Sequence, residues 1–174
     1  MTLEKYGVIL HRLTHDKIEM VRNWRNDPKI LKYMEFREYI TPEMQEKWFQ
    51  KINNDNNFFF IIEYEGKEIG LVNGKNIDYE QKTSEGGLFI YDDDYLNSDV
   101  PFRVSLCSSD FGFETLNLEK VFIHILSDNK RAIKYNLMLG FELQPNQENI
   151  RNQLYFQTKE NYFKKRALIK RLLN

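Results

Sequence analysis

The sequence holds few side chains of the kinds that act as nucleophiles or metal ligands. It has three histidines and one cysteine, and no group of His, Cys, Asp and Glu has the spacing of a metal site. Cys107 falls on an apolar helical stripe, which indicates a core residue rather than a nucleophile. His124 alternates with isoleucines, so we expect a packed core histidine there and at His11, and a turn residue at His15. These patterns predict no bound metal.

Hydrophobic spacing predicts the helices that would position other functional groups. Apolar residues recur at helical spacing over about 16–26 and again after Thr41-Pro42-Glu43, which is typical of a capped helix start. Further helices are predicted around 104–111 and over 130–139, and a basic helix follows the last strand. The predicted strands lie near 7–13, at 58–64, 67–73, 86–91 and 121–126, and near 153–158.

The order of these elements indicates the fold class. A strand and two helices precede three strands, and then helix and strand alternate twice. Antiparallel hairpins followed by a β-α-β crossover imply an α/β fold with a mixed sheet and helices on both faces. The chain has no internal repeat and no Pro/Gly/Ser-rich linker, so we predict a single domain over 1–174.

Composition narrows the classes of partner. Hydrophobic residues make up 41% of the 174 residues, which is enough for a sizeable core. Charged residues reach 29% with a net charge of -1, so we expect no nucleic-acid or membrane partner. A single cysteine fits a reducing compartment, and no apolar run approaches the ~18 residues that a membrane span needs. We therefore expect a soluble, cytoplasmic protein.

The segment SDNKRAIKYNLMLGFEL at 127–143 resembles the cofactor-binding helix of GNAT acetyltransferases. Asn129, Ala132, Ile133 and Leu-Gly-Phe at 139–141 match the family pattern at its spacing. The resemblance covers nearly the whole chain. It implies the GNAT fold, a mixed and mostly antiparallel sheet with helices on both faces, and acetyl-CoA as cosubstrate.

Two further stretches narrow the resemblance. VRNWRNDPKILKYM at 21–34 and YITPEMQEKWF at 39–49 resemble the first two helices of amino-sugar-nucleotide N-acetyltransferases of the pseudaminic-acid pathway type. Ribosomal-protein N-terminal acetyltransferases share a looser form. In such enzymes this segment walls the acceptor pocket, where an arginine can meet phosphate and an aromatic ring can stack on a base or sugar. An amphipathic helix with surface arginines is the alternative interpretation.

Acetyl transfer from a thioester to an amine requires donors for the CoA pyrophosphate, a donor for the developing oxyanion and a group that takes the ammonium proton. By the resemblance, Glu85 is the candidate base, and a solvated loop carboxylate is the alternative. Where the family often has a tyrosine as general acid, this chain has Asn136, whose amide could hydrogen-bond a thiolate or hold a water. Tyr135 lies one residue earlier, about 100° around the helix, and is more typical of a packing residue.

The expected phosphate loop departs from the family pattern. The stretch 96–102 has no glycine, although glycine lets a backbone approach phosphate closely. Ser98 or Asp99 would cap the next helix, and an Asp carboxylate there would compete with pyrophosphate for the same N–H groups. Asp92 to Asp94 add negative charge nearby, which Arg103 offsets in part. An ordinary capped helix that binds nothing is the alternative.

These considerations give two sets of predicted contact residues. Those expected to contact acetyl-CoA are Phe89, Ile90, Tyr91, Leu96, Asn97, Ser98, Asp99, Val100, Phe102, Arg103, Asn129, Ala132 and Tyr135. Those expected to contact the acceptor are Arg25, Asn26, Tyr33, Met34 and Phe36.

The predicted activity is N-acetylation of a small acceptor amine, carried on a nucleotide-linked amino sugar in surface-glycan synthesis. The alternatives are acetylation of a protein N-terminus or another amine, and a catalytically weak GNAT-fold binding domain. A homodimer is compatible with all of these.

Overall fold

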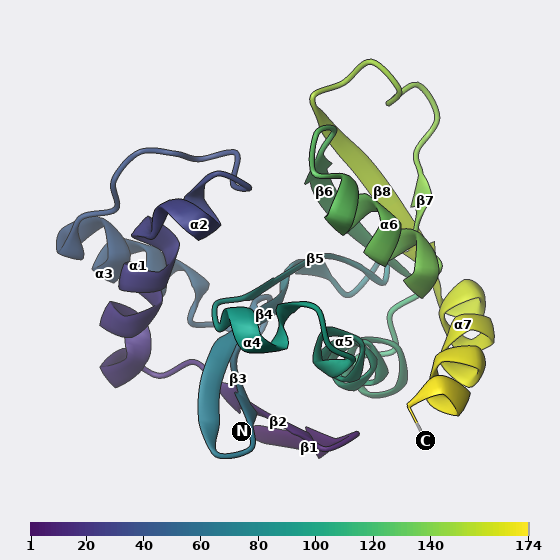
Figure 1. The fold of residues 1–174 in the computed structure, drawn as a ribbon, viewed down its shortest axis with the longest axis horizontal. Helices are drawn as coiled ribbons and strands as arrows, with labels where there is room; N and C mark the ends of the chain where they lie inside the picture. Colours follow the sequence, from purple (N-terminus) through teal and green to yellow (C-terminus); the bar gives the residue numbers. More distant parts are fainter. Residues whose placement is uncertain (174) are drawn as a thin grey trace.

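A computed structural model describes residues 1–173 and shows one eight-stranded sheet in the order β1-β2-β3-β4-β5-β6-β8-β7. Every neighbouring pair is antiparallel except β5–β6, which is parallel. The predicted mixed sheet is thereby confirmed (Figure 1). The strands are β1 Thr2–Lys5, β2 Val8–Arg12, β3 Phe58–Tyr64, β4 Lys67–Asp78, β5 Thr83–Ile90, β6 Lys120–Leu126, β7 Glu142–Leu143 and β8 Asn152–Thr158.

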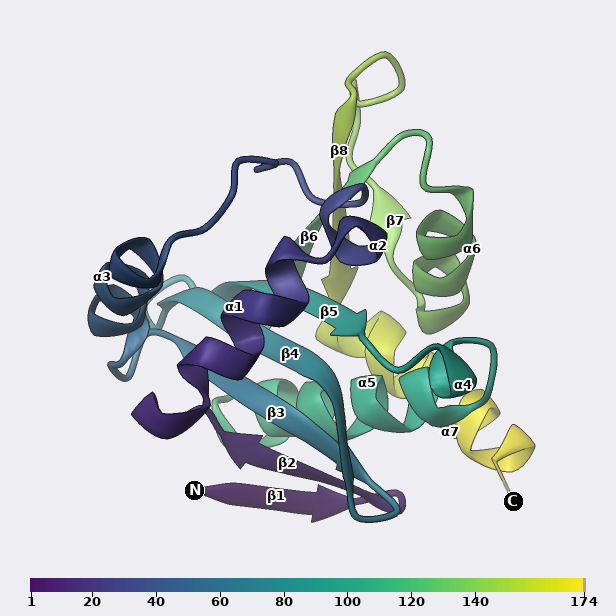
Figure 2. The same ribbon diagram turned by 60° about the vertical axis from the view of Figure 1, so that its left-hand side comes forward.

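Helices cover both faces of the sheet, as predicted. On one face α1 and α3 pack on β3 and β4 through a cluster that includes Val21, Phe49, Phe59 and Leu71. On the other face α5, α6 and α7 enclose a larger core, and Figure 2 shows α1 crossing the front of the sheet with α5 behind it. The helical segments are η1 His15–Lys17, α1 Ile18–Asn26, α2 Pro28–Leu31, α3 Pro42–Ile52, α4 Asp93–Leu96, α5 Val100–Asp110, η2 Phe111–Thr115, α6 Lys130–Leu139 and α7 Lys159–Leu172.

Local sequence signals explain several of these boundaries. The Thr41 hydroxyl accepts a hydrogen bond from the Met44 N–H at 3.2 Å, which confirms the predicted cap of α3. Helix α6 begins at the Asn129 side chain, which accepts from the Ala132 N–H, and ends at Gly140 with φ of 95°, a left-handed conformation that glycine adopts without strain. The predicted bounds of β3 and α6 are confirmed to the residue.

The sheet opens between its two central strands. β5 and β6 pair only from Thr83 to Glu85 and from Lys120 to Phe122. Beyond these residues β5 stays paired to β4, up to Ile90, and β6 stays paired to β8, up to Leu126. The backbone edges that face each other there are free to bind something other than a neighbouring strand.

At the last residue of α5, a group of charged and hydroxyl side chains ties both ends of the chain to the core. Asp110 is only 4% exposed and forms an ion pair with Lys5 of β1. It also accepts hydrogen bonds from Tyr6 at 2.6 Å, from Tyr162 at 2.5 Å and from Arg166 at 2.6 Å. We call these five residues the Asp110 cluster. Burial by itself would raise the pKa of Asp110, but the hydrogen bonds from its four partners outweigh burial and hold that pKa below its usual value.

Four short elements were not predicted: β1, α2, α4 and β7. β1 forms a hairpin with β2, and α4 ends at Leu96, where the expected phosphate loop begins. Among residues 1–173, no three or more His, Cys, Asp or Glu side chains are arranged to hold a metal ion. No helix in the same range is both long enough and apolar enough to cross a membrane.

Candidate active site

A cavity of about 780 Å³ occupies the opening between β5 and β6. Alternation along the two strands divides its lining between two faces of the sheet. Leu88, Ile90, Ile123 and Ile125 belong to the core on the α5 and α6 side. Phe89 packs with the α1 and α3 cluster on the other side. The cavity therefore runs through the sheet, with an apolar strip on one side and the helices of the N-terminal half on the other.

The start of α5 borders the cavity but offers few free backbone donors. The Ser98 hydroxyl accepts from the Val100 N–H at 3.1 Å, so Ser98 rather than Asp99 provides the cap. Pro101 has no N–H. The Asp99 carboxylate pairs with Arg103 at 2.7 Å, and Arg103 also donates to the carbonyl of Tyr6, away from the cavity. The Asp99 carboxylate, which was expected to compete with pyrophosphate for the N–H groups of this helix start, instead pairs with Arg103.

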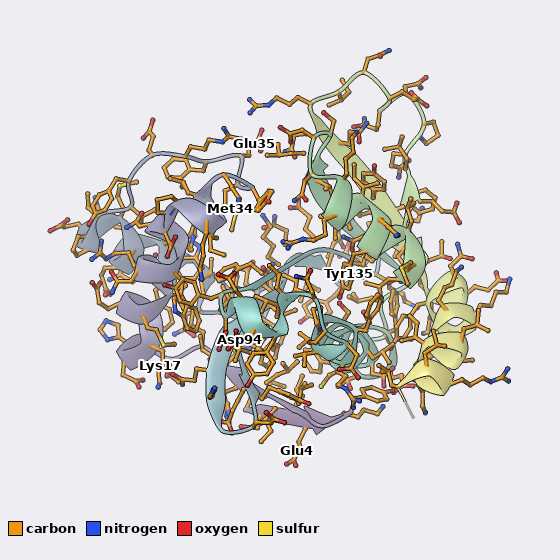
Figure 3. The ribbon with its side chains drawn as sticks, viewed as in Figure 1. Glu4, Lys17, Met34, Glu35, Asp94 and Tyr135 are labelled. Carbon is orange, nitrogen blue, oxygen red and sulfur yellow. The ribbon has the colours of Figure 1, made fainter. Side chains whose placement is uncertain are left out.

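Two side chains of α6 that face the cavity, Tyr135 and Asn136, are engaged within the protein. The Asn136 amide donates to the Ala132 carbonyl at 2.9 Å. The Tyr135 phenol donates to the Pro101 carbonyl at 2.7 Å and hydrogen-bonds the Ser105 hydroxyl at 2.6 Å, so it joins α6 to α5 (Figure 3). Burial raises the pKa of Tyr135 far above its usual value. This phenol is therefore a neutral hydrogen-bonding group, which suits packing better than proton transfer.

Arg25 is a weakly partnered cation of the N-terminal wall. Its guanidinium lies 5.1 Å from the centre of the Trp48 ring, and its one hydrogen bond is a long one of 3.5 Å to Gln45. Burial lowers the pKa of Arg25, because few polar groups replace the water it loses. An arginine stays protonated even so. The site therefore holds a cation that an anionic ligand would stabilise.

Neighbouring arginine and asparagine side chains of α1 serve the fold instead. Arg22 is 7% exposed and binds Glu19, the Tyr39 hydroxyl and the Ile40 carbonyl. The Asn26 amide exchanges two hydrogen bonds with the backbone of Ile40, at 2.9 and 2.8 Å. These contacts hold the chain between α2 and α3 in place, and they leave neither side chain facing the cavity.

That same segment between α2 and α3 reaches across the mouth of the cavity. The Glu35 carboxylate accepts from the Asn152 amide at 2.8 Å, at the start of β8. Tyr33 lies between two cations, with Lys32 at 4.8 Å and Arg131 of α6 at 5.8 Å from its ring centre. Figure 3 shows Met34 and Glu35 on the side of this segment that faces the β6–β8 half of the molecule. Two distant parts of the sequence thus meet over one opening.

Glu85 lies within β5 rather than before it, and its carboxylate is already engaged. Lys75 of β4 forms an ion pair with it at 3.3 Å, and the Asn76 amide donates to its other oxygen at 3.2 Å. It lines the cavity at the point where β5 and β6 separate.

The expectation of a packed core histidine at His124 is wrong, because that side chain is exposed and lines the cavity. His11 is not a core residue either: its side chain is 41% exposed and contacts Glu63 at 2.8 Å. His15 lies in η1, as expected of a turn residue, and contacts Glu46 at 2.7 Å. Cys107 is buried, as predicted, and burial raises the pKa of its thiol to about 11, so it is a poor nucleophile.

The charges that line the cavity are unequal in sign. Five cationic side chains face three acidic ones, and each acid has a partner within the protein. Among residues 1–173, Arg25, Lys32 and Arg131 form no ion pair. An electrostatically complementary ligand for this cavity carries negative charge.

The predicted contact residues divide accordingly. Those lining the cavity are Arg25, Tyr33, Met34, Glu85, Phe89, Ile90, Leu96, Asn129, Ala132, Tyr135 and Asn136. Those lying outside its lining are Asn26, Phe36, Tyr91, Asn97, Ser98, Asp99, Val100, Phe102 and Arg103. Tyr91 instead stacks on Trp24 of α1, with ring centres 5.4 Å apart. Sequence analysis missed His124, Asn73, Ser105, Arg131 and Asn152, which also line the cavity.

Comparison with known proteins assigns the family. The model of the acetyltransferase (GNAT) domain matches residues 8–142. The chain belongs to the GNAT acetyltransferase family. The GNAT match runs from β2 to the first residue of β7 and includes every cavity-lining residue except Asn152.

Two curated relatives are named as acetyltransferases. Spermidine N(1)-acetyltransferase of Escherichia coli is 24% identical over 140 residues, which cover 80% of this chain and 75% of that protein. Acetyltransferase PseH of Campylobacter jejuni is 25% identical over 126 residues, covering 70% of this chain and 74% of PseH. The protein is thus an acetyltransferase of a family whose members acetylate small amines.

Solved structures share the fold. FdhC, described as a nucleotide-linked sugar GNAT, has a TM-score of 0.81 and 19% identity, covering 100% of this chain and 99% of its own. Spermidine N-acetyltransferase of Vibrio cholerae, solved with CoA and spermine, has a TM-score of 0.75 and 21% identity, covering 90% and 98% of the two chains.

Proposed function

We propose that this protein transfers acetyl from acetyl-CoA to the amine of an anionic small molecule, a nucleotide-linked amino sugar used in surface-glycan synthesis. The observation that carries the proposal is the excess of cations along the cavity, above all the under-partnered Arg25. A nucleotide sugar offers a diphosphate to such cations and presents its amine several bonds away.

The apolar strip of β5 and β6 suits the thioester arm of acetyl-CoA. Leu88, Ile90, Ile123 and Ile125 line a slot whose strand edges are free of sheet partners. When bound there, acetyl-CoA supplies an activated acetyl group. The α5 start fits the diphosphate less well, because Ser98 and Pro101 leave few N–H donors in its first turn. We therefore expect binding with modest affinity rather than none.

A polyamine acceptor is the competing candidate, because spermidine acetyltransferases are among the relatives. A polycation would be repelled by Arg25, Lys32 and Arg131, and it would find Glu35 and Glu85 already paired. The cavity charge thus favours the anionic acceptor on electrostatic grounds.

The test is acetyl transfer to UDP- and dTDP-linked 4-amino sugars beside the same amino sugars without the nucleotide, spermidine and short peptides. A charge-assisted contact to phosphate contributes ~1.5–3 kcal/mol, so we expect the nucleotide-linked form to have a kcat/KM at least about tenfold above that of the free sugar. Turnover of spermidine or peptides without turnover of any sugar nucleotide would refute the proposed acceptor.

A further inference from the structure

Acetylation of an amine at neutral pH begins with the loss of a proton from an ammonium ion. The cavity side chains that can take that proton are Glu35, Glu85, Asp93 and His124. Glu35 accepts a hydrogen bond from the Asn152 amide, and Asp93 forms an ion pair with Lys29. Both oxygens of the Glu85 carboxylate already interact with Lys75 and Asn76. Within residues 1–173, His124 forms neither a side-chain hydrogen bond nor an ion pair, so both ring nitrogens are open to a ligand.

The strand register places His124 and Glu85 on the same face of the sheet. Glu85 of β5 is the parallel partner of Phe122 of β6, so their side chains share a face. His124 lies two residues beyond Phe122 and returns to that face, while Ile123 and Ile125 on the other face are 8% and 6% exposed. This is the face that α1 and α3 cover over β3 and β4.

The hydrophobic cluster formed by α1 and α3 includes no residue of β6. His124 is therefore not covered by these helices and is exposed. β5 has separated from β6 at this level, so an acceptor can lie between His124 and the β5 backbone. Three charged groups border the same space: Glu85 on β5, Arg131 on α6, and Glu35. Glu35 is held there by its hydrogen bond from Asn152 of β8. The imidazole thus stands at the boundary between the acceptor wall and the thioester slot.

We propose that His124 is the catalytic base of acetyl transfer. One ring nitrogen takes a proton from the acceptor ammonium, directly or through one water. The amine lone pair then forms a bond to the thioester carbonyl carbon, and the carbon–sulfur bond breaks. A second proton leaves the nitrogen of the acceptor and passes to the departing sulfur. The products are the amide, the CoA thiol and a protonated His124, which returns its proton to solvent.

This assignment has a chemical reason. Imidazole changes protonation state near neutral pH, so it can both accept the proton and release it within each turnover. It rests on amine acetylation, as the proposed function does, but on no particular acceptor. The assay therefore uses whichever amine of the panel the wild-type enzyme turns over best, so that failure of the sugar specificity leaves this test intact.

The experiment compares the pH profiles of kcat/KM for wild type and His124→Gln. General-base catalysis typically contributes 10²–10⁴-fold, so we expect a loss of about 100-fold or more at pH 7. The deficit should shrink as the pH approaches the pKa of the acceptor amine, where solvent has already removed the proton. His11→Gln, a histidine outside the cavity, is the matched control and should keep the wild-type profile.

Two further measurements separate a base from a structural residue. The melting temperature of His124→Gln should equal that of wild type, because the side chain is exposed. Added imidazole should restore part of the activity of His124→Ala. Wild-type activity in His124→Gln at pH 7 would overturn the proposal, and so would a loss of the same factor at every pH.

Discussion

Two groups of charged side chains, the Asp110 cluster and the cavity lining, differ in how completely they are partnered. In the Asp110 cluster, one buried carboxylate receives two phenols, an ammonium and a guanidinium. In the cavity, Arg25 has a single long hydrogen bond, and His124 forms no side-chain contact of that kind within residues 1–173.

The difference indicates what each group is for. Removing water from a charged group is costly unless the protein replaces the lost hydrogen bonds. The Asp110 cluster replaces them with donors from β1 and α7, so it can hold those elements to α5 without a ligand. The cavity leaves Arg25 and His124 for a bound molecule to satisfy. In this chain, charged groups whose hydrogen bonds are all made within the protein stabilise the fold. Charged groups that lack such partners are the ones available to bind a ligand.

The largest expected effect falls on the Asp110 cluster. Asp110→Asn should lower the free energy of unfolding by about 2–4 kcal/mol, less than for a fully buried pair because Lys5 and Arg166 keep some solvent contact. The comparison is by urea unfolding against Glu4→Gln, an exposed carboxylate on β1. A loss of stability as small as that of Glu4→Gln would contradict the structural role.

The same variant should also lose part of the acid sensitivity of the wild type. Because the folded-state pKa of Asp110 is held below its usual value, its contribution is complete above pH ~4 and is lost as pH falls through the folded pKa. Wild type and Asp110→Asn should therefore converge in stability below pH ~4.

The next effect concerns the cavity. Arg25→Ala should lower kcat/KM for an anionic acceptor by about tenfold to a hundredfold, since a charge-assisted contact to phosphate contributes ~1.5–3 kcal/mol. Acetyl-CoA affinity should stay at the wild-type value, because Arg25 belongs to the acceptor wall. Arg171→Ala on the exposed side of α7 is the control. Equal losses of kcat/KM in the two variants would mean that Arg25 contributes only to the net charge of the protein and makes no specific contact with the acceptor.

The smallest effect is expected at the start of α5. Asp99→Gly removes an ion pair with Arg103 and little else, so the free energy of unfolding should fall by roughly 0.5–1 kcal/mol. Acetyl-CoA affinity, measured by calorimetry, should change less than about threefold, because the carboxylate is turned toward Arg103. A several-fold gain in affinity would show instead that Asp99 repels the CoA phosphates.

The sequence by itself determined the elements whose signals are local. The Thr41-Pro42 start of α3, the Asn129 cap and the Gly140 end of α6 each depend on residues within one helical turn. The apolar run of β3 likewise fixed that strand to the residue, and the 127–143 segment indicated the family that the comparison assigned. Hydrogen bonds and contacts between residues this close in sequence can be predicted from the local sequence alone.

Only the tertiary structure decided which of these residues meet in the cavity. Alternation placed His124 opposite its neighbouring isoleucines, but it carried no information on whether another layer covers that face. That depends on α1 and α3, which come much earlier in the chain and do not extend over β6. The direction of the Asp99 carboxylate depended in the same way on Arg103, which is itself fixed by Tyr6 and Leu173. The exposure of a side chain and the identity of its hydrogen-bonding partner depend on residues far away in the chain. The spacing of residues within one segment therefore cannot predict them.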